Sequence, residues 1–97
     1  MAEDGSDTTA VAIATKIHAD KCEIYKDVDG VYNNDPKVDN NAIKYESLNF
    51  DDMLTLSNAG AKILQNTSVE IAKDNNMPIF IKSIFTNKIG TIIGENI

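Results

Sequence analysis

The segment Ile79–Ile84, which reads IFIKSI, gives the clearest indication of the fold. It is a nearly continuous apolar run that Lys82 interrupts, and it follows directly after a proline. Runs of this kind are typical of strands that lie inside a sheet covered on both faces. On either side along the chain, short stretches rich in strand-forming residues predict two further strands, at Cys22–Tyr25 and at Thr91–Ile93. The segment therefore predicts a central strand in a layered fold.

Helices are expected between these strands because good capping residues precede apolar positions at helical spacing. A short tail at 1–4 comes before the first helix, and the polar stretch 38–45 shows no regular pattern. The first expected helix has Ser6 and Asp7 as capping residues and runs to Ala19. A second helix begins after Asn49 and ends near Gly60, and a third begins at Thr67 and stops at Asn75. Strands that alternate with helices predict an α/β fold with a mainly parallel sheet.

Composition indicates a single domain and excludes two classes of partner. The chain has 97 residues, of which 42% are apolar, and this suits one domain with a modest core. The net charge of -6 argues against a nucleic acid, whose phosphates favour basic surfaces. No apolar run is long enough to cross a membrane, and the N-terminus lacks a signal-peptide pattern, so we expect a cytoplasmic protein. The single cysteine, Cys22, lies in an apolar run that is typical of a buried thiol.

A second stretch, EIYKDVDGVYNNDPK at Glu23–Lys37, places acidic and turn-forming residues between apolar ones. A calcium-binding EF-hand loop needs an oxygen ligand at its fifth position and a glycine at its sixth. Counted from Asp27, these two positions hold Val31 and Tyr32, so the calcium hypothesis fails. Two interpretations stay open from the residues alone: a solvated hairpin built from turn residues, or one wall of a phosphate-handling site.

Five motifs occur here in the order and spacing found in aspartate kinases, and together they cover nearly the whole chain. They are GSDTTAVAIA at 5–14, EIYKDVDGVYNNDPK at 23–37, NFDDMLTLSNAGAKIL at 49–64, SVEIAKDNNMPIFIKS at 68–83 and GTII at 90–93. The chain therefore resembles an aspartate kinase. The resemblance implies the amino acid kinase fold, a three-layer α/β/α sandwich, with residues 5–97 as its C-terminal, nucleotide-binding half. The family's N-terminal half and its regulatory ACT domains are expected to be missing from this segment.

The resemblance also implies an activity for the parent enzyme. That enzyme would transfer the γ-phosphate of ATP to the side-chain carboxylate of L-aspartate, the first step of lysine, threonine and methionine biosynthesis. ATP with Mg²⁺ would be the co-substrate, and no tightly bound cofactor is expected. We expect the chain alone to be inactive, since catalysis would need the other half of the domain. The alternative is a non-catalytic module, a truncated relic that binds nucleotide or a partner chain. Half a sheet leaves an unpaired edge, which suggests a homodimer.

Site residues implied by the resemblance each have a plainer structural interpretation beside them. Ser6 and Asp7 would bind aspartate at a helix N-terminus, although an ordinary helix cap has the same pattern. The nucleotide would be bound by six residues, namely Lys26, Asp27, Tyr32, Lys37, Lys62 and Ile63. Turn residues and solvated lysines at helix ends have the same appearance in a sequence. No residue is assigned to a metal.

Two of these positions depart from the family pattern. Lys26 stands where aspartate kinases have threonine, and Lys37 stands where they have arginine. Lysine keeps the positive charge of arginine but lacks its bidentate fork. The sequence therefore predicts weaker ATP binding than the full family pattern would give.

Overall fold

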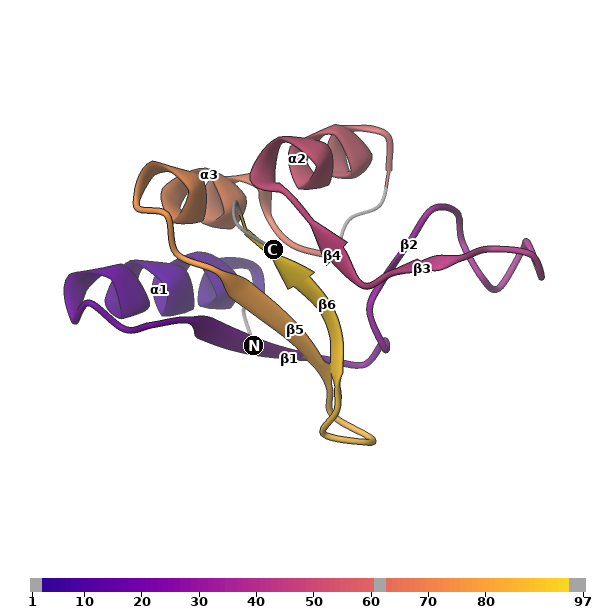
Figure 1. Ribbon diagram of the computed structural model, residues 1–97, viewed down its shortest axis with the longest axis horizontal. Coiled ribbons are helices and arrows are strands. Elements are labelled where there is room, and N and C mark those ends of the chain that lie inside the picture. Colours follow the sequence, from indigo (N-terminus) through magenta and orange to yellow (C-terminus); the bar gives the residue numbers. More distant parts are fainter. Residues whose placement is uncertain (1–2, 61–62, 95–97) are drawn as a thin grey trace.

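The computed structural model describes residues 3–60 and 63–94, with side chains from Asp7 onward. Its helices are α1 (Glu3–Lys16), α2 (Phe50–Asn58) and α3 (Asn66–Asp74). Its strands are β1 (Cys22–Lys26), β2 (Val31–Tyr32), β3 (Lys44–Tyr45), β4 (Ser47–Leu48), β5 (Ile79–Ser83) and β6 (Ile89–Ile93). The helices lie along the main sheet, while the segment with β2 and β3 extends away from it (Figure 1). We call that segment, residues 31–45, the arm.

The main sheet has the strand order β1-β5-β6-β4. Strand β5 pairs with β1 in parallel, so that Cys22 lies opposite Ile79 and Lys26 lies opposite Ser83. On its other side β5 forms an antiparallel hairpin with β6, and β6 pairs in parallel with β4. Two of these three pairings are parallel, and the helices lie in the connections between strands. The predicted α/β fold with a mainly parallel sheet is confirmed.

The core lies between the sheet and the helices. Ile79 and Ile81 of β5 are completely buried, whereas Phe80 and Lys82 between them remain partly exposed. The helices contribute Val11, Ala14, Phe50, Met53, Val69 and Ala72 to the same buried cluster. Because the described helices pack on one side of the sheet, β5 is fully covered on one face only. The expectation that it would be buried on both faces is therefore wrong for the residues described.

Strand β1 places the single cysteine on the buried face. Cys22 is 6% exposed and belongs to the core cluster, as its apolar surroundings in the sequence predicted. Burial, and to a lesser degree the carboxylates of Asp7 and Glu23, raise the pKa of the Cys22 thiol. The neutral thiol is therefore the form present at neutral pH, and it packs as a small apolar group.

Helix α2 follows the sequence prediction at both ends. The Asn49 side chain is the N-cap, and its Oδ1 accepts a hydrogen bond from the Asp52 amide at 2.7 Å. After the C-cap residue Ala59, Gly60 adopts a φ of 117°, a conformation that glycine permits without a steric penalty. The stop of α3 at Asn75 is likewise confirmed.

Helix α1 begins and ends earlier than the sequence predicted. It starts at Glu3, so Ser6 and Asp7 are helical residues and not its N-cap, and residues 3–4 are not a tail. The sequence carries two acidic residues before Ser6, and acidic residues favour the first turn of a helix. The helix ends at Lys16, and His18 just beyond has a φ of 58°. None of the described helices is both long and apolar enough to span a membrane.

Helix α3 also begins before its predicted cap. It starts at Asn66, and the N-cap residue Gln65 makes no side-chain capping hydrogen bond. Thr67 lies in the first turn, where its hydroxyl is 2.8 Å from the Thr8 hydroxyl of α1. The tertiary contact with α1 therefore takes the place of the cap that the sequence predicted.

The arm contains regular structure that the polar stretch 38–45 did not reveal. Within it β2 and β3 pair antiparallel, with Val31 opposite Tyr45 and Tyr32 opposite Lys44. The Asn33 amide extends this ladder with a hydrogen bond to the Ile43 carbonyl at 3.0 Å. Two-residue strands are too short to show an alternation of apolar and polar residues, so periodicity could not have found them.

Replacing the α2 cap tests the local basis of this helix. We expect Asn49→Ala to lower the free energy of unfolding by about 1 kcal/mol, because the Asp52 amide loses its partner. Urea unfolding followed by circular dichroism measures this change. The matched control is Asn40→Ala at an exposed position of the arm, where a change of less than about 0.5 kcal/mol is expected. Equal unfolding midpoints for the two variants would contradict the assignment.

Candidate functional site

A cleft of about 770 Å³ opens beside the carboxyl ends of β1 and β5. Its walls come from four places in the chain: the segment after β1, the arm, the end of α2 with the loop that follows, and the β5–β6 hairpin. The lining residues are 27–30, 32–37, Leu56, 59–60, Ile63, Ser83 and 85–86. The carboxyl edge of parallel strands is where α/β proteins place their ligand sites. The cleft is therefore the leading candidate for a functional site.

The cleft has an apolar part and a polar part. Leu56, Ile63 and Phe85 supply apolar surface, and the Phe85 side chain is 76% exposed. The polar lining includes Asp27, Asp29, Asn33, Asn34, Asp35 and Lys37. An apolar surface beside a few polar groups is the usual composition of a small-molecule site. Lys37 is the one cationic side chain among the described residues that line the cleft.

Tyr32 is held in the cleft wall by its own loop. Its hydroxyl donates a hydrogen bond to Asp29 Oδ2 at 3.0 Å. Partial burial raises the pKa of the Tyr32 phenol, and the hydrogen bond to Asp29 and the charge of that carboxylate add to the effect. The phenol therefore stays protonated at neutral pH and continues to donate to Asp29. This contact fixes the direction of the ring.

The loop that carries Lys37 is fastened by local side-chain contacts. The Asp35 amide donates to Asn34 Oδ1 at 2.9 Å, and the Lys37 amide donates to Asp35 Oδ1 at 2.9 Å. Such bonds between an aspartate or asparagine side chain and nearby backbone amides stabilise tight turns. They place the exposed Lys37 side chain on the wall of the cleft.

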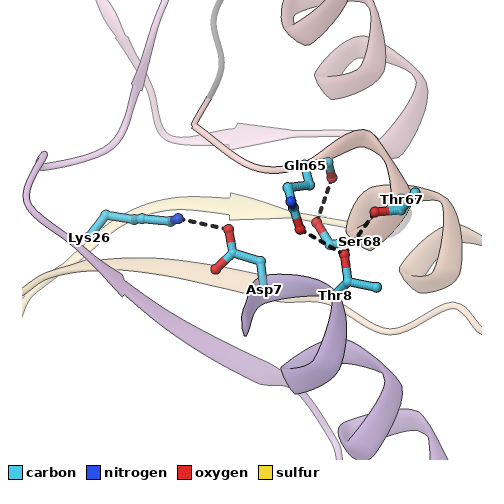
Figure 2. A network of polar contacts seen from close by, with 6 residues as sticks. All are labelled: Asp7, Thr8, Lys26, Gln65, Thr67 and Ser68. Carbon is cyan, nitrogen blue, oxygen red and sulfur yellow. Dashed lines mark hydrogen bonds and ion pairs between the residues drawn. The ribbon is translucent and has the colours of Figure 1, made fainter. Parts of the chain in front are cut away.

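Lys26 forms an ion pair with Asp7 (Figure 2). It is not among the residues that line the cleft. The Lys26 Nζ is 2.7 Å from Asp7 Oδ2, and the two side chains are 25% and 9% exposed. Lys26 ends β1 and Asp7 belongs to α1, so this charge-assisted hydrogen bond ties the helix to the carboxyl end of the strand. The positive charge of Lys26 is thereby balanced within the chain.

Next to this pair, polar side chains join α1 to the start of α3 (Figure 2). The Thr8 hydroxyl donates to Gln65 Oε1 at 3.0 Å and lies 2.8 Å from the Thr67 hydroxyl. Since one hydroxyl carries a single proton, Thr67 is the donor in the second contact. The Ser68 hydroxyl donates to the Gln65 carbonyl at 2.6 Å. These contacts fix the relative position of the two helix N-termini.

Four of the site residues named from the sequence come together in the cleft: Asp27, Tyr32, Lys37 and Ile63. Lys26 and Asp7 pair with each other beside it. Lys62 lies outside the described residues. The Ser6 backbone is part of α1, but its side chain is also outside what the structure describes. The roles implied for these residues stay predictions.

Sequence reasoning missed the apolar lining at Leu56 and Phe85. Leu56 was assigned only to the apolar positions of a helix, and Phe85 was given no assignment. The signal that could have found Phe85 is its place just beyond the carboxyl end of β5, because ligand sites in α/β sheets gather residues from strand carboxyl ends. Among the described residues, no three His, Cys, Asp or Glu side chains lie close enough together to hold a metal ion.

Comparison with known proteins now decides the family. A sequence model of the amino acid kinase family matches residues 3–83. The chain belongs to the amino acid kinase family. The aspartokinase of Corynebacterium glutamicum is 50% identical to it over 93 residues, which are 96% of this chain and 22% of that enzyme. The chain thus spans less than a quarter of the length of this relative, and the resemblance to aspartate kinases is confirmed.

Solved structures of this family have the same fold. The aspartate kinase from Synechocystis matches 97% of the chain and 16% of its own length, with a TM-score of 0.87 and 38% identity. Aspartokinase III of E. coli, in complex with aspartate and ADP, matches 97% of the chain and 22% of its own length, with a TM-score of 0.86 and 31% identity. Both likenesses support the α/β fold.

A double-mutant cycle tests the ion pair between Lys26 and Asp7. We expect Lys26→Met to lower the free energy of unfolding by about 1–3 kcal/mol, because the buried Asp7 carboxylate loses its partner. The double variant Asp7→Asn with Lys26→Met should cost less than the sum of the two single changes. Urea unfolding measures all three.

The exposed pair of Lys73 and Asp51 serves as the control for this cycle. Its side chains are 48% and 72% exposed, so Lys73→Met is expected to cost less than about 1 kcal/mol. Strictly additive effects of Asp7→Asn and Lys26→Met would show that the two residues do not interact in solution.

Proposed function

We propose that this chain is the nucleotide-facing segment of an aspartate kinase. The parent enzyme transfers the γ-phosphate of ATP to the side-chain carboxylate of L-aspartate, which begins the biosynthesis of lysine, threonine and methionine in the cytoplasm. In this proposal the cleft binds MgATP as a substrate, and the start of α1 with Ser6 and Asp7 contributes to the aspartate site. Phosphoryl transfer itself requires the remaining part of the parent domain.

One observation carries the proposal. The cleft gathers Asp27, Tyr32, Lys37 and Ile63, residues that two separate aspartate kinase motifs nominated. Ile63 lies far from the other three in the sequence, so its place in the same cleft is a tertiary feature that supports the interpretation from the motifs. The complex of the E. coli relative with aspartate and ADP supports the same choice of ligands.

The chemistry of the lining suits a nucleotide. The apolar side chains of Ile63 and Phe85 offer surface for a flat base, and the Tyr32 ring adds an aromatic face. Lys37 offers a positive charge for the phosphates, and catalysis of phosphoryl transfer depends on such charge neutralisation and on positioning. Lys26 ends the neighbouring strand β1, where its charge is paired with Asp7.

The domain assignment follows from the same proposal. Residues 5–97 act as the C-terminal half of an amino acid kinase domain, and the N-terminal half and the ACT domains are its partners in the parent enzyme. The alternative, a module that binds nucleotide without catalysis, makes the same use of the cleft. The two differ in whether phosphoryl transfer appears when the N-terminal half is supplied, which a radiolabelled ATP assay with L-aspartate would measure.

The free edge of β1 underlies the expected homodimer. In the described sheet β1 pairs with β5 on one side only, so the backbone groups on its other side face outward. We expect two copies of the 97-residue chain to associate through this edge. Sedimentation equilibrium measures the mass, and a monomer at a concentration of about 1 mM, where even a weak dimer would form, would contradict the expectation.

Titration with MgATP tests the nucleotide site. We expect amide NMR shifts in residues 26–37 and near Ile63, and little change in α1 beyond its first turns. The variant Lys37→Ala should bind MgATP about 10-fold more weakly, because the cleft loses the one cationic side chain among its described lining residues.

The control for this titration is Lys88→Ala, an exposed lysine of the β5–β6 hairpin that does not line the cleft. Its affinity for MgATP should equal that of the unmodified chain. The proposal is wrong if millimolar MgATP causes no shifts, or if the shifts fall on surfaces remote from the cleft.

A further inference from the structure

Thr91 is a completely buried polar residue in the middle of β6. Its hydroxyl accepts a hydrogen bond from the Val31 amide at 2.9 Å and donates one to the Tyr45 carbonyl at 2.6 Å. Val31 and Tyr45 are opposite residues of the two strands of the arm. The Thr91 hydroxyl of the main sheet therefore bonds to both strands of the arm, to the Val31 amide in β2 and to the Tyr45 carbonyl in β3.

The backbone beside this hydroxyl leaves no room for a side chain at Gly30 or at Gly90. A Cβ added to Gly90, the neighbour of Thr91, would lie 1.8 Å from the Asp29 carbonyl oxygen. A Cβ added to Gly30 would lie 2.7 Å from Thr91 Oγ1 and 2.8 Å from Lys44 Cδ. Residues 29–31 therefore run directly against β6. There is no room for a side chain between residues 29–30 and Gly90 of β6.

The arm depends on this attachment because its own strands are short. Strands β2 and β3 have two residues each, and an isolated two-stranded hairpin is at best marginally stable in water. Most of the arm beyond Tyr32 is exposed to solvent. Its direction in space must therefore come from the points where it touches the main sheet. The Thr91 hydroxyl is one such point, and it bonds to both strands at once.

The residues next to this contact belong to the cleft. Tyr32 follows Val31 directly, and Asp29 and Gly30 precede it. The fastened loop 33–37, which carries Lys37, continues from the same strand. A displacement of Val31 from Thr91 would move every one of these lining groups together.

We propose that Thr91 is a positioning residue of the cleft. Its hydroxyl sets the place of Tyr32 and Lys37 relative to Ile63 and Phe85, and thereby sets the affinity for the nucleotide without touching it. This inference rests on the proposed function where it concerns MgATP. The attachment of the arm to β6 stands on the two hydrogen bonds alone.

Amide hydrogen exchange tests the attachment. Thr91→Val keeps the shape of the side chain and removes both hydrogen bonds, leaving the Val31 amide without its partner. We expect the Val31 amide to exchange about 10-fold faster, the factor that corresponds to loss of one ordinary hydrogen bond, while amides of β1 and β5 keep their protection. Thr91→Ser keeps the hydroxyl and should restore slow exchange. Unchanged protection of Val31 in Thr91→Val would overturn the attachment.

A general loss of stability must be separated from a local effect. The matched control is Val69→Ala, which removes buried apolar groups from α3, a helix that contributes no lining residue to the cleft. We expect its exchange rates to rise throughout the core and not selectively in the arm. If Thr91→Val does not fold, Thr91→Cys, which keeps a weak donor, takes its place with the same expectation.

The affinity for MgATP tests the positioning role. At a temperature where all variants are folded, we expect Thr91→Val to bind about 10-fold more weakly than the unmodified chain, whereas Thr91→Ser and Val69→Ala bind within about 2-fold of it. Equal binding by Thr91→Val would overturn the positioning role. Failure of the unmodified chain to bind MgATP would overturn the proposed function instead, and the exchange result would then decide the attachment by itself.

Discussion

The parallel pairing of β1 with β5 is the interaction on which the rest of the structure depends. It places Ile24 opposite Ile81 at the centre of the core, where each large apolar side chain contributes roughly 1.5–3 kcal/mol on burial. Parallel pairing also brings the carboxyl ends of the two strands to the same edge of the sheet. The segment after Lys26 and the hairpin after Ser83 therefore start side by side, and the cleft forms between them.

The cleft wall is built from segments with little regular structure of their own. Its stability comes from short-range side-chain contacts, such as those of Asn34 and Asp35 within the loop, and from the hydroxyl of Thr91 that joins the arm to the sheet. A rigid scaffold that carries irregular segments is the common arrangement in binding proteins, because loops can vary in composition while the core stays packed. Here the residues at which the loops meet the scaffold, such as Thr91, contribute to the shape of the site.

The open face of the sheet explains an apparent inconsistency in β5. Its apolar sequence suits a strand covered on both sides, yet the described helices cover one side. On the other side, the Lys82 ammonium lies 5.3 Å from the centre of the Tyr25 ring and 3.6 Å from Glu23 Oε1. The lysine stem covers part of the exposed apolar surface while its charge remains near water. The continuous apolar run is the pattern of a strand in a three-layer sandwich, the fold that the family implies.

Local signals in the sequence were sufficient to locate the helices, the longer strands and part of the cleft lining. The Asn49 cap, the glycine that follows α2, the strand at β5 and the place of Asp27, Tyr32 and Lys37 in the cleft wall all depend on residue types at fixed spacing. The family could also be identified from the sequence, because the order and spacing of motifs along the chain can be read without coordinates.

Only the tertiary structure decided which partners these residues meet. Lys26 pairs with Asp7, Thr67 meets Thr8 instead of capping its helix, and Thr91 holds both strands of the arm. Each of these contacts joins segments far apart in the sequence, and their formation depends on how the packed layers orient the backbone. A sequence determines propensities over a few residues, whereas the free energy of a buried polar contact depends on groups that packing alone brings together.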